Sequence, residues 1–352
     1  MINRHGKKIP EKLVIIESDD WGAIRTPSRE ALQAFAKKGM DVARSVYKVD
    51  SLASKEDLEK LFDVLSSFTG ADRRPAKLTA NVIMANPDFD KIRASDYREY
   101  HYEHFADTFK KYPEHQKNLG LWKKGMEEGV FRPQYHGREH LNYRRWLRAL
   151  LSGNEDVRFC FNWHTTFSGK EDYSFMEAFD WDTRDDIAEQ KEVVKEGLRL
   201  FRQTFGYASK SFIAPCYNWD PDLETTLYEN DVRWVQGIRS QMAPTGSFGS
   251  YSPIRHTYGE VAASGLRYNI RNCYLEPSMN PEKDWVSSCL AQIASAFLFH
   301  KPAVICSHRI NYVGFIDPDN RERGLKDLRE LLKTVVKRWP DARFISTDEL
   351  TD

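Results

Sequence analysis

Two adjacent carboxylates, Asp19 and Asp20, follow a short apolar run at residues 12–17 (KLVIIE). Like charges side by side at the end of a strand repel each other, so a compensating group is expected close to them. A divalent metal ion with a neighbouring proton acceptor is one arrangement that uses both carboxylates. The alternative interpretation is that Ser18 or Asp19 only caps a following helix.

A pair of histidines, His136 and His140, follows another apolar run at residues 131–135 (FRPQY). On one helical turn, imidazoles at this spacing would face the same way and could share an ion. Two unrelated exposed histidines are the alternative, because such pairs also arise by chance. With Asp20 they would supply three protein ligands and leave one position open, as in catalytic zinc sites. The pattern therefore predicts a catalytic metal centre.

Other polar groups also follow apolar runs. His308 ends one such run and is expected to transfer a proton, whereas His164 is a weaker candidate for that role. Cys216 could turn its backbone amide toward the site and bind a developing oxyanion. The sequence offers no basic partner for the Cys216 thiol, which argues against a cysteine nucleophile.

The elements that must position these groups alternate between short apolar runs and longer helical patterns. We expect strands at residues 12–17, 77–84, 131–135, 157–162, 210–214, 232–236, 267–271, 303–307 and 343–346. We expect helices at 187–205 with a stop at Gly206, after Asp220-Pro221, after Asn280-Pro281, and from Leu325 to Val335. This alternation predicts a parallel α/β fold, a barrel rather than an open sheet, in which functional groups collect where strands end.

Composition limits the function classes further. Lys plus Arg and Asp plus Glu both number 52, so no net charge attracts nucleic acid or a membrane. The apolar run near the N-terminus is too short for a signal peptide or a membrane span. The five scattered cysteines suit buried free thiols and a cytoplasmic protein. We expect one domain over residues 1–352, with 86–130 as a helical excursion; the sequence indicates no oligomeric state.

Serine hydrolases, P-loop enzymes and dinucleotide-binding enzymes are disfavoured, because the sequence has no GxSxG, no Walker loop and no GxGxxG after a strand. In order, the remaining motifs resemble those of the polysaccharide deacetylase family, which shares the chitooligosaccharide deacetylase homology domain. The family's Asp-Asp-Gly, His-Ser/Thr-x-x-His, Arg-x-Pro-Tyr and Leu-x-x-His motifs are similar to residues 19–22 (DDWG), 136–140 (HGREH), 213–216 (IAPC) and 305–308 (ICSH).

This resemblance implies a distorted (β/α) barrel of about seven strands. It implies that Asp19 is the general base and His308 the general acid. It also implies that Asp20, His136 and His140 bind a divalent ion, for which zinc is the first choice. The activity it implies is hydrolysis of a carbon–nitrogen amide bond, with an acetyl group removed from an N- or O-acetylated sugar or polysaccharide.

The chain departs from the family at Ile213, where the family has the arginine that orients the base. Arg271 and Arg309 could replace it, and Arg309, beside the proposed acid, is slightly favoured. Candidates for contacts with substrate or oxyanion are Trp21, Cys216, Tyr217, Arg271 and Arg309. A glycan hydrolase on the same barrel, a non-catalytic carbohydrate-binding relative and a two-histidine-one-carboxylate iron oxygenase remain alternatives.

Overall fold

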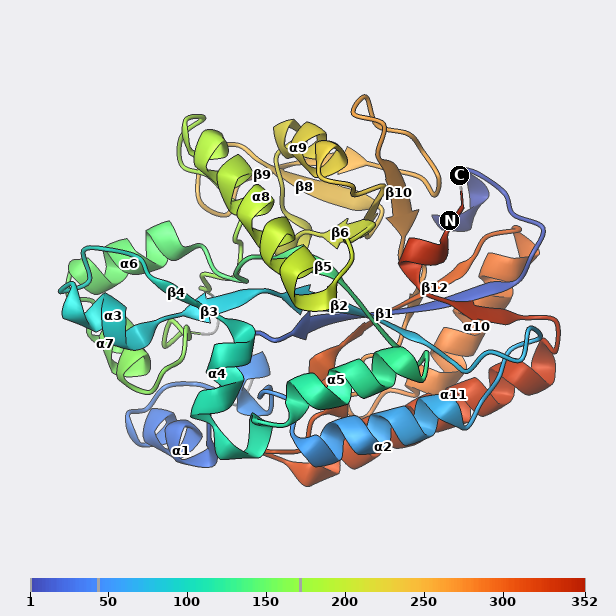
Figure 1. Cartoon of the computed structure of the whole chain (residues 1–352), viewed down its shortest axis with the longest axis horizontal. Helices are drawn as coiled ribbons and strands as arrows, with labels where there is room; N and C mark the ends of the chain where they lie inside the picture. The colour runs from blue at the N-terminus through green and yellow to red at the C-terminus, as the bar shows by residue number, and fades with distance from the viewer. Residues whose placement is uncertain (1, 43–44, 171–172, 352) are drawn as a thin grey trace.

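A parallel β-sheet forms the centre of the protein (Figure 1). The structure is a computed structural model that describes residues 2–42, 45–170 and 173–351. The sheet runs in the order β10-β7-β6-β5-β2-β1-β12-β11, with β13 beside β1. Its strands are β1 (Leu13–Trp21), β2 (Leu78–Ile83), β5 (Phe131–Gly137), β6 (Ser211–Ile213), β7 (Trp234–Gly237), β10 (Arg267–Ile270), β11 (Cys273–Tyr274), β12 (Ala303–His308) and β13 (Arg343–Ile345).

One bent segment joins the two edges of this sheet. β10 pairs with β7 and β11 pairs with β12, yet only Arg271 and Asn272 separate β10 from β11. The Arg271 amide donates to the carbonyl of Gly237 at 2.8 Å, and the Asn272 amide donates to that of Val304 at 3.1 Å. With β10 and β11 counted as one bent strand, seven positions surround the axis. The predicted distorted barrel is confirmed.

The interior of the barrel is polar. Fully buried polar side chains come from most of its strands: Glu17, Thr79, Asn81, Gln134, Ser211, Gln236, Asn269 and Arg271. Asn81 of β2 and Gln236 of β7 are not sheet neighbours, but their amides exchange hydrogen bonds of 2.7 and 2.9 Å. Such cross-barrel bonds satisfy polar groups that would otherwise be costly to bury.

Helices cover the outside of the sheet. In Figure 1, α2, α5, α10 and α11 lie along one side, and α8 and α9 lie on the other. The helices are α1 (Arg29–Lys37), α2 (Lys55–Ser66), α3 (Phe89–Ala94), α4 (Phe105–Lys111), α5 (Asn118–Glu127), α6 (Tyr143–Leu151), α7 (Glu155–Asn162), α8 (Asp186–Phe205), α9 (Glu224–Glu229), α10 (Trp285–Leu298) and α11 (Pro318–Arg338). Two small antiparallel ladders pair β3 (Ala85–Pro87) with β4 (Tyr102–His104), and β8 (Ser240–Pro244) with β9 (Tyr251–Arg255).

The expected strand at residues 157–162 is wrong, because these residues lie in helix α7. The Asn154 side chain accepts a hydrogen bond from the Val157 amide at 3.1 Å and caps the helix. Val157, Cys160 and Phe161 then bury one helical face. Their spacing of three and four residues fits a helix as well as an apolar strand, and the cap decides between the two.

Helix boundaries follow local capping chemistry. The helix expected at 187–205 is confirmed as α8, which ends at Gly206 in the left-handed conformation with φ 78°. The start expected at Asn280-Pro281 is wrong, because α10 begins at Trp285 and Asp284 caps it through the Ser287 amide at 2.9 Å.

All five cysteines lie in the described part of the chain and are free thiols; four are buried and Cys216 is exposed. Among the described residues, no helix combines the length and the apolar character needed to cross a bilayer.

Candidate active site

A cavity of about 330 Å³ opens where several barrel strands end. Residues expected from the sequence that line it are Asp19, Asp20, His136, His140, Cys216, Tyr217 and His308. They come from four separate segments of the chain, the ends of β1, β5 and β12 and the turn that follows β6. The barrel therefore brings together side chains that are far apart in sequence.

The end of β1 is irregular where the two carboxylates lie. Its register against β2 shifts between Ser18 and Trp21, and Asp20 has a left-handed backbone with φ 72°. In a regular strand the side chains of Asp19 and Asp20 would point to opposite faces. The bulge turns the second one, so both carboxylates reach the same cavity. Such a conformation costs on the order of 1–3 kcal/mol and is typical of functional sites.

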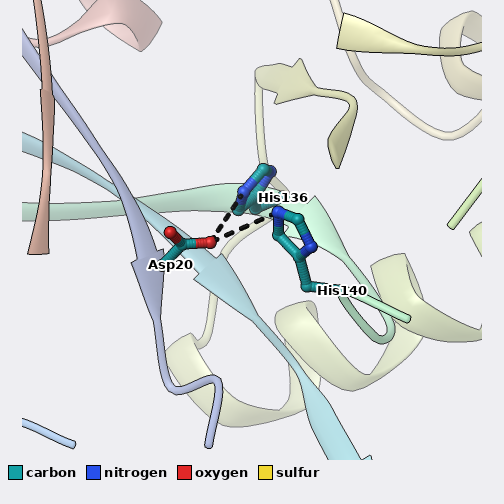
Figure 2. Close-up of side chains that lie close together, drawn as sticks. All are labelled: Asp20, His136 and His140. Atoms are coloured by element: carbon teal, nitrogen blue, oxygen red, sulfur yellow. Dashed lines mark ion pairs between the residues drawn. The ribbon is translucent and has the colours of Figure 1, made fainter. Parts of the chain in front are cut away.

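Asp20, His136 and His140 form a compact cluster (Figure 2). Asp20 Oδ1 lies 3.6 Å from His136 Nε2 and 3.3 Å from His140 Nε2. The sequence suggested that the two histidines share one helical turn, and this is wrong. His136 belongs to strand β5, and Gly137, with φ 140°, bends the chain toward His140. The two rings meet because the strand ends in a tight turn.

The cluster fits a divalent metal ion. His136 Nδ1 lies 2.9 Å from the Ile213 carbonyl, so it carries the proton, and Nε2 is left as a bare acceptor. Within the described residues, this buried Nε2 has no hydrogen-bond partner. Asp20 Oδ1 is separated from the two imidazole nitrogens by 3.3 and 3.6 Å. Such separations are expected of ligand atoms that each lie about 2 Å from one tetrahedral ion. Two nitrogens and one oxygen are ligands that zinc accepts.

Asp19 is held by neutral and charged donors. The Arg271 guanidinium donates to both carboxylate oxygens at 2.7 Å, and Asn81 Nδ2 donates to Oδ1, also at 2.7 Å. Burial alone would raise the pKa of Asp19, but the Arg271 charge outweighs it and holds the pKa well below its usual value. Arg271 also donates from Nε to Glu17 at 2.7 Å, and this second contact fixes the orientation of the guanidinium.

Arg271, and not Arg309, is the arginine that contacts Asp19. Arg309 is fully buried and turns away from Asp19: it donates to Asp50 at 2.7 and 3.2 Å and to the Ala23 carbonyl at 2.6 Å. The slight preference for Arg309 was wrong. Proximity to His308 in sequence does not bring Arg309 to Asp19, because its guanidinium is held by Asp50 and the Ala23 carbonyl.

His308 lies between two carboxylates. Its Nδ1 is 2.6 Å from Glu276 Oε1, and its Nε2 is 3.6 Å from Asp19 Oδ2. Burial opposes a charged imidazole, but Glu276, then Asp19 and Asp20, outweigh that effect and raise the pKa of His308 to about 10. Glu276 thus orients the ring, and the raised pKa favours its protonated form.

Cys216 and Tyr217 form the turn after β6, and both have left-handed backbones with φ 56° and 55°. Both line the cavity, and the Tyr217 hydroxyl accepts a hydrogen bond from Arg271 Nη1 at 3.1 Å. Two consecutive residues with strained backbone at a cavity wall are consistent with a role for this turn in the site.

Four expected residues do not line the cavity: Arg271 and Arg309, described above, and Trp21 and His164. Trp21 is buried in the core with 1% of its surface exposed, donates to Ser18 Oγ at 3.0 Å and packs edge-on against Phe131, so it does not line the cavity. His164 follows helix α7 instead of a strand and stacks on Phe89, with 5.1 Å between ring centroids.

Sequence reasoning missed Arg25, Asp50 and Glu276, all of which line the cavity. Arg25 and Asp50 do not directly follow a predicted strand, so the strand-end criterion could not find them. Glu276 follows the apolar residues Cys273-Tyr274-Leu275, a run too short to be predicted as a strand. Asn81 could have been found, because it is a polar residue inside an otherwise apolar strand segment, which is the signal of an interior-facing position.

No protein-family model matches this chain, and no curated protein matches it. Several solved structures do resemble it. Polysaccharide deacetylases are among them. A probable one from Pseudomonas aeruginosa PAO1 has a TM-score of 0.45 at 9% identity, over 96% of this chain and 88% of that one. A putative one from Mycobacterium smegmatis has a TM-score of 0.42 at 11% identity, over 98% and 91%.

A solved structure that is not described as a deacetylase is also similar. The 4-alpha-glucanotransferase from Thermococcus litoralis has a TM-score of 0.43 at 10% identity over 98% of this chain. The present chain spans only 40% of the length of that protein.

Proposed function

We propose that this protein is a metal-dependent hydrolase that removes an acetyl group from an N- or O-acetylated sugar or polysaccharide. The observation that carries the proposal is the unpartnered His136 Nε2 beside Asp20 and His140, next to the ion-paired Asp19 and the protonated His308. A metal site, a base and an acid around one cavity are the parts that amide hydrolysis requires.

Asp20, His136 and His140 would hold the ion. When bound, a divalent ion supplies Lewis acidity, which polarises a carbonyl group and lowers the pKa of water. The Ile213 carbonyl keeps His136 in the tautomer that presents Nε2 to the cluster.

Asp19 acts as the base in this proposal. Because Arg271 holds its pKa far below the usual value, Asp19 is ionised at every physiological pH and is always ready to accept the proton of the attacking water. The same low pKa makes Asp19 a weak base, and a bound ion would supply the lowered pKa of the attacking water that such a base needs. The two-pronged contact with Arg271 fixes the plane of the carboxylate.

His308 acts as the acid. After water has added to the carbonyl carbon, the bond to the leaving nitrogen breaks and that nitrogen takes a proton from His308 Nε2. Glu276 holds Nδ1 and so turns Nε2 toward the reacting atoms near Asp19. The Cys216 amide is the proposed donor to the oxyanion.

The test is acetate release. The zinc-loaded protein is incubated with N-acetylated and O-acetylated mono- and oligosaccharides, and acetate and reducing ends are both measured. We expect acetate without new reducing ends, and loss of the activity on chelation. New reducing ends without acetate would identify a glycan hydrolase instead. Sugar binding without any product would identify a non-catalytic binding protein.

A further inference from the structure

Arg25 lies on the wall of the cavity and has few hydrogen-bond partners. Its side chain is only 3% exposed, and Nη2 donates to Asp20 Oδ1 at 3.2 Å. Within the described residues, the buried Nε has no hydrogen-bond partner. Asp50 Oδ2 lies 3.7 Å from Arg25 Nε, which is too far for a hydrogen bond.

The other two buried arginines near the cavity are well satisfied. Arg271 donates through Nε, Nη1 and Nη2 to Glu17 and Asp19. Arg309 also donates through all three nitrogens, and it occupies Oδ1 of Asp50. Because a buried guanidinium with unused donors is costly, the contrast indicates that Arg25 meets an acceptor that the chain itself does not provide.

The proposed metal would increase this need. An ion held by Asp20 takes the oxygen to which Arg25 now donates, and Asp50 is already neutralised by Arg309. A planar guanidinium with free donors is suited to a carboxylate or a phosphate, which can accept two parallel hydrogen bonds.

We propose that Arg25 binds an oxyanion of the substrate, so that the molecule hydrolysed here is an acetylated sugar that also carries a carboxylate or phosphate. This inference rests on the proposed function and narrows its substrate class. Arg25 is a specificity residue in this view, and the neutral acetylated sugar is the poorer ligand.

Three ligands that differ only at one carbon test the inference: N-acetylglucosamine, the corresponding uronic acid, and N-acetylglucosamine 6-phosphate. Binding is measured by calorimetry to zinc-loaded protein that carries His308→Ala, so that no turnover interferes. We expect at least one anionic ligand to bind about tenfold or more tightly than the neutral one, as a charge-assisted bond allows. The better of the two anions identifies the source of the oxyanion. If both anionic ligands bind only as tightly as the neutral ligand, or more weakly, the proposal is overturned. This outcome needs no substitution of Arg25.

Arg25→Lys then tests whether the preference depends on this one side chain, because lysine keeps the charge but cannot form the bidentate hydrogen bonds of a guanidinium. We expect the anionic ligands to lose most of their advantage while neutral-ligand affinity and zinc content stay within about twofold of the parent. Arg321→Lys is the matched control and should keep the preference, because Arg321 is similarly buried but pairs with Glu56, Asp57 and Glu322 and does not line the cavity. Loss of zinc in Arg25→Lys, or equal weakening of all three ligands, would show that Arg25 only positions Asp20.

Acetate release separates this inference from the proposed function. Release from all three sugars at equal rates supports the deacetylase and contradicts the anion site. Anion preference that depends on Arg25, with no acetate released from any sugar, supports the anion site and contradicts the deacetylase.

Discussion

Asp19 and Asp20 are neighbours in the chain but lie in opposite kinds of surroundings. Asp19 faces the barrel interior, where two nitrogens of Arg271 and one of Asn81 donate to it at 2.7 Å. The Asp20 carboxylate faces two imidazoles at 3.3 and 3.6 Å, and among the described residues only Arg25 donates a hydrogen bond to it, at 3.2 Å. The first carboxylate is fixed by the protein itself, whereas the second is arranged with acceptor atoms that suit a bound ion.

The difference teaches how one strand end can serve two chemical roles. A regular strand would send one carboxylate into the barrel and the other outward, and the bulge with Asp20 at φ 72° prevents this. Satisfied hydrogen bonds hold a base in one orientation. Unsatisfied nitrogens, such as His136 Nε2, are tolerated where a ligand completes them.

The substitution Asp19→Asn should distinguish the roles of the two carboxylates most clearly. The amide cannot accept the proton of water, and we expect turnover to fall by about 10²–10⁴-fold. Zinc content should stay near one ion per chain, because Asp19 is not in the ligand cluster. Acetate-release kinetics and elemental analysis of the same sample measure both. Turnover within a few-fold of wild type would remove Asp19 from the chemistry.

Replacing Arg271 tests what holds the base. Arg271→Met leaves two buried carboxylates, Glu17 and Asp19, without their shared counter-charge, and we expect the free energy of unfolding to fall by about 3–5 kcal/mol. Arg271→Lys keeps the charge and loses the fork, so turnover should drop far more than zinc affinity. Denaturant unfolding and kinetics measure the two effects. Full activity in Arg271→Lys would mean that the fork does not orient Asp19.

The smallest expected effect concerns the turn after Asp20. Gly22 has φ 86°, and a Cβ there would lie 2.6 Å from the Ile83 carbonyl oxygen. Gly39 has a similar φ of 80° but open space around it, so Gly39→Ala reports backbone strain alone. We expect Gly22→Ala to lower the free energy of unfolding by about 1–3 kcal/mol, more than Gly39→Ala does. Equal losses in thermal or denaturant unfolding would mean that the close approach to β2 is unimportant.

Much of the site could be predicted from the sequence, because its main members lie at the ends of strands. Asp19, His136 and His308 are placed by the periodicity of their own strands and by the rule that parallel strands end at one edge. Asp20 reaches the cavity only because the bulge at the end of β1 turns its side chain, and periodicity does not predict that. The polar residues inside apolar runs, such as Asn81, carry the same kind of signal.

The rest depends on packing between distant segments. Arg271 and Arg309 both end or follow predicted strands, and only the bent strand that closes the barrel decides which one reaches Asp19. Glu276 reaches His308 from the segment after β11, and the apolar run before it, Cys273-Tyr274-Leu275, is too short to predict a strand. Helix α7 was mistaken for a strand because its apolar residues suit both periods.

Zinc binding to a set of single variants tests the central claim most directly. Wild type, His136→Ala, His140→Ala and His308→Ala are stripped with chelator, titrated with zinc by calorimetry and then analysed for bound metal. We predict one tight site in wild type, loss of most of that binding in His136→Ala and in His140→Ala, and nearly unchanged binding in His308→Ala, because His308 lies outside the Asp20 cluster. Equal zinc loss in all three variants, or no tight site in wild type, would contradict the account.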